Sequence, residues 1–149
     1  VYRYVLEVRH PTFFATPELL EPLLQRSGAG RVMFDSRPIY REDAQHPEVL
    51  SARHKKPDVP LLDTVYNALV YARVVLHPDA KHNGPYVEEW LHRCESYLAA
   101  GHTVYFMMHC PNNQHCPEFA ADFHQRLCGS VPGLAPLSPW PVPRQDSLF

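Results

Sequence analysis

The sequence contains no apolar run that approaches the roughly 20 residues needed to span a bilayer, so we expect no membrane partner. It also lacks an excess of either charge: 14 Lys and Arg against 16 Asp and Glu give a net charge of -2. That balance argues against a globally basic nucleic-acid binder and leaves room only for a local basic patch. We expect no signal peptide before the first predicted strand, and therefore a cytoplasmic protein whose four cysteines stay reduced.

The length and hydrophobic content of the chain suffice for one globular domain, because 45% of the 149 residues are hydrophobic and 11% are aromatic. The chain begins with Val1 and enters an apolar strand almost at once, so we interpret it as a fragment of a longer polypeptide. The pattern predicts strands and helices in alternation, which indicates an α/β fold with a parallel sheet. The predicted strands are 2–10, 31–36, 68–77 and 103–109, and the predicted helices are 16–30, 84–101 and 117–129.

Two segments fall outside this alternation. The stretch 37–67 is much longer than an ordinary connection, and we expect it to be a lid or a binding segment. The stretch 136–149 is too rich in proline for regular structure, so the sequence predicts a domain over 1–135 and a tail over 136–149.

Charged side chains cluster where the predicted strands end. Glu7, Arg9 and His10 close the first strand, Asp35 and Arg37 close the second, and Arg73 lies within the third. Because ligands of parallel sheets bind at the carboxyl ends of the strands, we expect a pocket for an anionic ligand there. In that pocket Glu7 or Asp35 would move a proton as the catalytic group, and the other side chains would hold the ligand. The alternative is an internal ion-pair network that sets the strand register.

A second basic group, "RHKK" at 53–56, lies in the long connection. We count Lys55 and Lys56 among the candidate ligand-binding residues, since clustered cations contact phosphate or nucleic acid chiefly through charge. The alternative is an ordinary solvated loop.

The stretch "HCPNNQHC" at 109–116 invites a zinc interpretation, but adjacent His and Cys residues cannot easily bind one ion together. We therefore predict no metal site and identify no cofactor. Cys110 is a weak candidate for a nucleophile, because no base partner can be assigned to it. Cys94 and Cys128 lie on predicted helical faces and are most simply core residues.

The last five residues, "QDSLF", resemble the short peptide by which many bacterial DNA-processing proteins bind the replication sliding clamp. Gln145 offers a two-sided amide, and Leu148 and Phe149 form an apolar anchor for a pocket. The alternative is that this anchor packs onto the protein's own domain.

Several stretches together resemble the YecE-like family, also called domain of unknown function 72: "LEVRHPTFF" (6–14), "RVMFDSRP" (31–38), "RHKKPDVP" (53–60), the Arg73 strand and "SLF" (147–149). The resemblance implies a TIM-type (β/α) barrel, related in shape to the endonuclease IV and xylose isomerase group. This chain would supply roughly the second half, about four βα units. Many members carry "FNND" after the last strand, where this chain has "MMHCPNNQHC" (107–116).

The family has no established activity, so the resemblance implies a fold and a site but no reaction. Our leading hypothesis is a binding or hydrolase-like catalytic pocket for a phosphorylated small molecule or nucleic acid. The alternative is a non-catalytic adaptor that binds a protein partner, such as the sliding clamp, through its tail. Because an open half barrel leaves two sheet edges unpaired, we also expect the fragment to self-associate.

Overall fold

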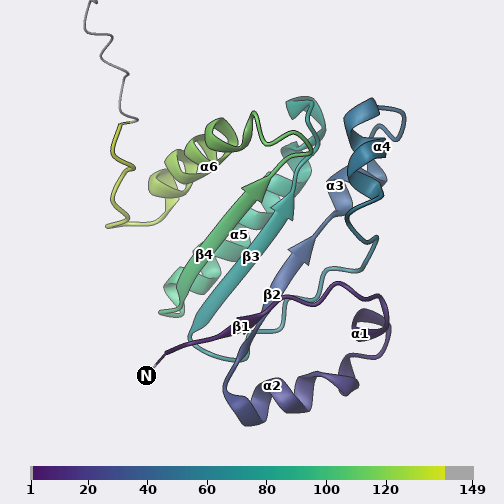
Figure 1. Ribbon diagram of the computed structural model, residues 1–149. Helices are drawn as coiled ribbons and strands as arrows, with labels where there is room; N and C mark the ends of the chain where they lie inside the picture. Colours follow the sequence, from purple (N-terminus) through teal and green to yellow (C-terminus); the bar gives the residue numbers. More distant parts are fainter. Residues whose placement is uncertain (1, 140–149) are drawn as a thin grey trace, which may run out of the picture.

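The sheet is the centre of the computed structural model, which describes residues 2–139. Four parallel strands lie in the order β1-β2-β3-β4, and each follows the previous one in the chain (Figure 1). The α/β fold with a parallel sheet is thus confirmed, whereas the described residues form no closed barrel. The strands are β1 (Val5–Leu6), β2 (Gly30–Asp35), β3 (Leu69–Val75) and β4 (Thr103–His109).

Helices connect the strands and cover one face of β3 and β4, where α5 and α6 pack side by side (Figure 1). The sequence pattern predicts both of these helices, and it also predicts one continuous helix over 16–30. That segment is divided, because Pro22 has no N–H and starts a new helix in place of continuing the first. The helical elements are α1 (Thr12–Ala15), η1 (Pro17–Leu19), α2 (Glu21–Ser27), α3 (Arg37–Arg41), α4 (Pro47–Arg53), η2 (Ala80–His82), α5 (Gly84–Ala99) and α6 (Cys116–Ser130).

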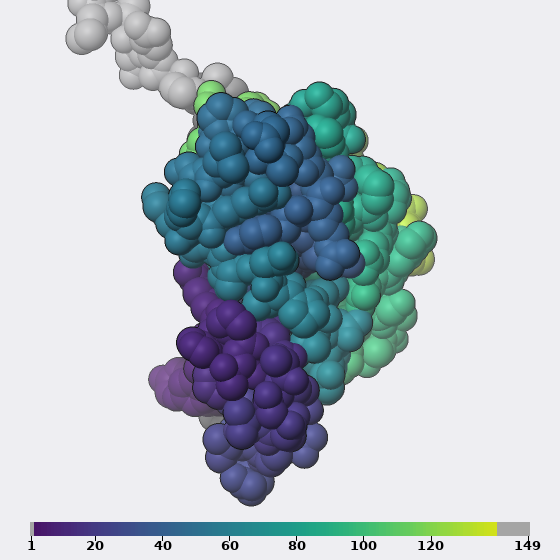
Figure 2. Space-filling model, turned by 90° about the vertical axis from the view of Figure 1, so that its right-hand side faces the viewer, coloured from purple at the N-terminus to yellow at the C-terminus, as the bar shows by residue number. Residues whose placement is uncertain are grey.

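The stretch 37–67 is more ordered than predicted, since it contains the two short helices α3 and α4. A proline lies in the first turn of each, where its missing N–H leaves no hydrogen bond unmade. Ile39 and Val49 are fully buried in a core with Phe34 and Val75, so this segment is anchored to the sheet. Figure 2 shows α3 and α4 (blue) and the N-terminal segment (purple) forming one continuous side of the molecule.

The two faces of the sheet have different surroundings. Val70, Ala72 and Val74 of β3 pack with Trp90 of α5 in the main hydrophobic core. The alternate residues of β3 point to the opposite face, which we call the inner face. There Tyr71 stacks on Tyr105 of β4, and the face stays partly open, because Tyr105 is 50% exposed and Met107 is 36% exposed.

The first strand is much shorter than the predicted range 2–10. Only Val5 and Leu6 pair with β2, opposite Gly30 and Arg31. A Cβ at Gly30 would come within 2.9 Å of Val5 Cγ1, so the glycine permits this close approach of the two strands. Beyond Leu6 the chain leaves the sheet and carries Glu7 above the neighbouring strands.

Candidate functional site

Glu7 is the centre of an ion-pair cluster on the inner face. Arg73 Nη1 donates to Glu7 Oε1 at 3.0 Å and to Oε2 at 2.9 Å, and Arg9 Nε donates to Oε1 at 2.7 Å. Glu7 follows β1 and Arg73 belongs to β3, so the ion pair spans β2, which lies between these strands. The structure therefore brings three of the predicted site residues together.

The two arginines control the charge of this carboxylate. Burial alone would raise the pKa of Glu7, but hydrogen bonds from Arg73 and Arg9 lower the pKa overall. Glu7 is therefore ionised at neutral pH and releases rather than holds a proton. That state suits a group that orients Arg73 better than it suits a general acid.

Lys56 adds a third cation to the cluster. It follows α4, and burial first, then the charges of Arg73 and Arg9, lower the pKa of its ammonium group. The charge of its exposed neighbour Lys55 also lowers the pKa of Lys56. Lys56 thus lies near the two arginines that pair with Glu7, and the cluster has three cationic side chains for one carboxylate.

His109 completes the cluster, although the sequence analysis assigned it no site role. It is the last residue of β4 and lies opposite Val75 in register, one pleat beyond Arg73. Burial and the positive charge of Arg73 lower the pKa of His109, while a hydrogen bond with Asn113 opposes them. The imidazole is therefore neutral at neutral pH and can accept a proton. The signal that could have found it was its position at a strand's carboxyl end.

One hydrogen-bond donor of Arg73 has no partner among the described residues. Its Nε atom is buried and has no hydrogen-bond partner among the described residues, while the Nη1 atom serves Glu7. An unpartnered buried donor is costly, so an acceptor brought by a ligand would be favoured at this position.

Asp35 lies elsewhere, and the expectation that it shares one opening with Arg73 is wrong. In register, Phe34 is opposite Arg73 and Asp35 is opposite Val74, so Asp35 faces the helices. It is fully buried there, and four donors saturate its carboxylate. These are Arg37 N and Nε on Oδ1, both at 3.0 Å, and Arg37 Nη2 at 2.9 Å and Trp90 Nε1 at 2.8 Å on Oδ2.

Arg37 lies with Asp35, outside the Glu7 cluster. Its guanidinium also pairs with Glu89 of α5 at 3.0 Å, so it lies on the helix side of the sheet. Hydrogen bonding to Asp35 raises the pKa of Arg37 despite burial. Asp35 and Arg37 thus form an internal ion pair, as the alternative interpretation of the sequence expected. The ion pair of Glu7 and Arg73, in contrast, is partly exposed.

The remaining predicted residues are peripheral or lie outside the described residues. His10 is exposed beside α1, where its Nδ1 atom accepts a hydrogen bond from Thr12 N at 3.3 Å. The three tail residues Gln145, Leu148 and Phe149 lie beyond residue 139. Clamp binding, self-association and the boundary at residue 135 stay predictions.

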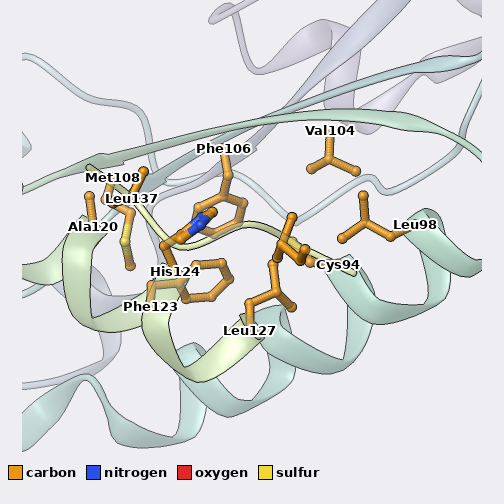
Figure 3. Close-up of a pocket in the computed structure, with 11 residues that line it drawn as sticks. Cys94, Leu98, Val104, Phe106, Met108, Ala120, Phe123, His124, Leu127 and Leu137 are labelled. Carbon is orange, nitrogen blue, oxygen red and sulfur yellow. The ribbon is translucent and has the colours of Figure 1, made fainter. Parts of the chain in front are cut away.

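An apolar pocket of about 260 Å³ lies on the helix side, between β4, α5 and α6 (Figure 3). Phe106, Phe123 and Leu127 are among its lining residues, and Leu137 lies along it from the segment after α6. His124 is turned to the backbone of that same segment, at 2.8 Å from Ala135 O. We interpret this space as a gap in helix packing, because charged groups do not converge on it.

Comparisons with known proteins decide the family. The family described as "Protein of unknown function DUF72" matches residues 1–144. The chain belongs to the DUF72 family. It is 31% identical over 156 residues to the UPF0759 protein YecE of Escherichia coli K12, and equally similar to the protein of that name from Escherichia coli O157:H7. The resemblance stated from the sequence is thus confirmed.

The alignments cover nearly all of this chain but only part of each YecE protein. Each covers 99% of this chain and 54% of the YecE protein, so the chain spans about half the length of these DUF72 relatives. No solved structure gives a significant match.

The described residues also bear on metal binding and on membrane insertion. Over residues 2–139, no group of three or more His, Cys, Asp or Glu side chains is arranged to hold a metal ion. Within the same range, the helices are too short or too polar for any of them to cross a membrane.

Proposed function

We propose that this DUF72 chain binds an anionic ligand with a phosphoryl group at the carboxyl ends of β3 and β4. One observation carries the proposal: Arg9 and Arg73 pair with the single carboxylate of Glu7, and Lys56 lies within range of the charges of both arginines, on a partly open face. Because one carboxylate cannot neutralise three cations, a bound anion would complete the charge balance.

The residues have different roles in this proposal. Arg73 donates to the phosphoryl oxygens through the Nε atom that has no partner, and Glu7 fixes the plane of its guanidinium. Lys56 and Arg9 contribute charge and further donors. His109 accepts a proton from the ligand or from a water beside it, a role that we assign to this histidine rather than to the enclosed Asp35.

We further propose that the sheet is the second half of a (β/α) barrel, as the family resemblance implies. The sequential order of the four parallel strands supports this interpretation, since neighbouring strands of such barrels follow one another in the chain. The inner face supports it too, because Tyr71, Tyr105 and Met107 would lie against the opposite wall of a closed barrel. The cationic cluster would then lie at the barrel mouth.

The ligand is tested by calorimetric titration with inorganic pyrophosphate and, separately, with a short single-stranded oligonucleotide. The variants are Arg73→Met and the matched control Arg126→Met, which removes an arginine from an exposed ion pair with Glu88 on the helix side. Charge-assisted hydrogen bonds are worth about 1.5–3 kcal/mol, so we expect Arg73→Met to weaken binding about 10- to 150-fold. We expect Arg126→Met to bind as the unmodified protein does.

The two ligands distinguish a small phosphorylated molecule from nucleic acid. Oligonucleotide binding that falls steeply with salt, with no binding of pyrophosphate, identifies nucleic acid. Equal losses in the two variants, or no binding of either ligand by the unmodified protein, would overturn the proposal. Circular dichroism spectra show whether each variant is folded.

A further inference from the structure

Two cysteines lie in contact beside the candidate site, at the two ends of one short loop. Cys110 is the first residue after β4, and Cys116 is the first residue of α6. Their Sγ atoms are 3.5 Å apart, and the backbone N–H of Cys110 donates to Cys116 Sγ at 3.2 Å. Both are free thiols in this structure.

The intervening loop holds the two thiols in this arrangement. Asn113 has a φ of 59°, a left-handed conformation that turns the chain back toward its starting point. The side-chain oxygen of Asn112 lies 3.5 Å from Cys110 Sγ, and that of Asn113 lies 3.7 Å from Cys116 Sγ. A disulfide needs the sulfur atoms at about 2.05 Å, so a local shift of about 1.5 Å would close the bond.

We propose that Cys110 and Cys116 are a redox-active pair that hydrogen peroxide converts to an intramolecular disulfide. The Cys116 thiolate attacks hydrogen peroxide, so that an S–O bond forms, the O–O bond breaks and hydroxide leaves, which takes up the proton lost by the Cys116 thiol and becomes the first water. Cys110 Sγ then attacks Cys116 Sγ, the S–O bond breaks and a second water leaves with the thiol proton. The two thiols lose two electrons and two protons in total, and hydrogen peroxide becomes two molecules of water.

The burial of the two thiols sets this order. Cys116 is partly exposed, whereas Cys110 is 1% exposed. Burial and the hydrogen bond with Cys116 raise the pKa of Cys110 to about 11, so its thiol stays protonated and unreactive toward peroxide in solution. Cys110 therefore acts second, on a sulfur that is already in contact with it.

The disulfide would affect the neighbouring site through the loop. His109 directly precedes Cys110, and the Asn113 side chain, which hydrogen-bonds His109, belongs to the loop that the disulfide would close. Oxidation would therefore hold Asn113 in place beside His109. The disulfide chemistry itself does not depend on the identity of the ligand.

The test is peroxide treatment of the folded protein, alkylation of the remaining thiols, and digestion after glutamate. Cleavage at Glu95 and Glu118 releases the peptide 96–118, which contains Cys110 and Cys116 and no other cysteine. We expect this peptide to escape alkylation and to be lighter than the reduced peptide by two hydrogen atoms. Oxidation of Met107 or Met108 adds oxygen atoms and is therefore distinguishable.

The matched controls are Cys116→Ser and Cys128→Ser. We expect Cys116→Ser to abolish the two-hydrogen loss and Cys128→Ser to leave it unchanged. A peptide 96–118 that only gains oxygen on sulfur, or that cross-links to a peptide with Cys94 or Cys128, would overturn the proposal. Because the first arm uses the unmodified protein, a variant that fails to fold does not affect its result.

Discussion

Replacing Asp35 by alanine tests whether this buried carboxylate stabilises the fold. The substitution removes the acceptor of four hydrogen bonds and leaves Trp90 Nε1 buried without a partner. Breaking a buried ion pair by removing one member typically costs about 3–5 kcal/mol. Arg37 keeps its contact with Glu89, which places the expected loss toward the lower end, at about 3 kcal/mol.

The assay is urea unfolding followed by circular dichroism. With a urea dependence of about 2 kcal/mol/M, a loss of about 3 kcal/mol lowers the unfolding midpoint by about 1.5 M. Asp35→Asn keeps one acceptor oxygen, and we expect it to lose roughly half as much. The matched control is Glu7→Gln, which weakens a partly exposed ion pair and is expected to cost less than about 1 kcal/mol. A midpoint for Asp35→Ala equal to that of Glu7→Gln would refute the reasoning.

Two further predictions concern Glu7 and Asn83. The folded-state pKa of Glu7 lies below its ordinary value of 4.5, so its stabilising effect is present above that pH and is lost as the pH falls. We therefore expect Glu7→Gln to flatten the decline of the urea midpoint below about pH 4.5, and an unchanged profile would contradict this. The Asn83 side chain accepts from His77 N at 2.8 Å and donates to His77 O at 2.9 Å, both in the buried interior. We expect Asn83→Ala to cost about 2 kcal/mol in thermal or urea unfolding, and a loss below about 0.5 kcal/mol would contradict the assignment.

The regular part of the fold could be predicted from the sequence, because its signals are local. The apolar runs of β2, β3 and β4 and the helical period of α5 mark these elements without reference to the rest of the chain. The short helices α3 and α4 escaped prediction, since neither is longer than about two turns. They are stabilised by burial of Ile39 and Val49 rather than by helix propensity.

The site was predicted in part for the same reason. Glu7, Arg9 and Arg73 meet because strand ends of a parallel sheet share one edge, which a sequence pattern can indicate. Asp35 was expected in the same opening because it closes the second strand. Since β2 is buried on both faces, that position does not tell which side of the sheet the Asp35 carboxylate faces. The contact between Cys110 and Cys116 depends on the turn at Asn113, which the sequence analysis did not identify.

The charges on the helix side form a continuous chain with a consequence for thermal behaviour. Asp35 pairs with Arg37, Arg37 with Glu89, Glu89 with Arg93, and Arg93 with Asp63. The free energy needed to dehydrate such ions falls on heating, whereas the gain from burying apolar surface levels off. As the temperature rises, this chain of ion pairs, which joins the sheet, α5 and the connecting segment, therefore contributes a growing fraction of the stability of the domain.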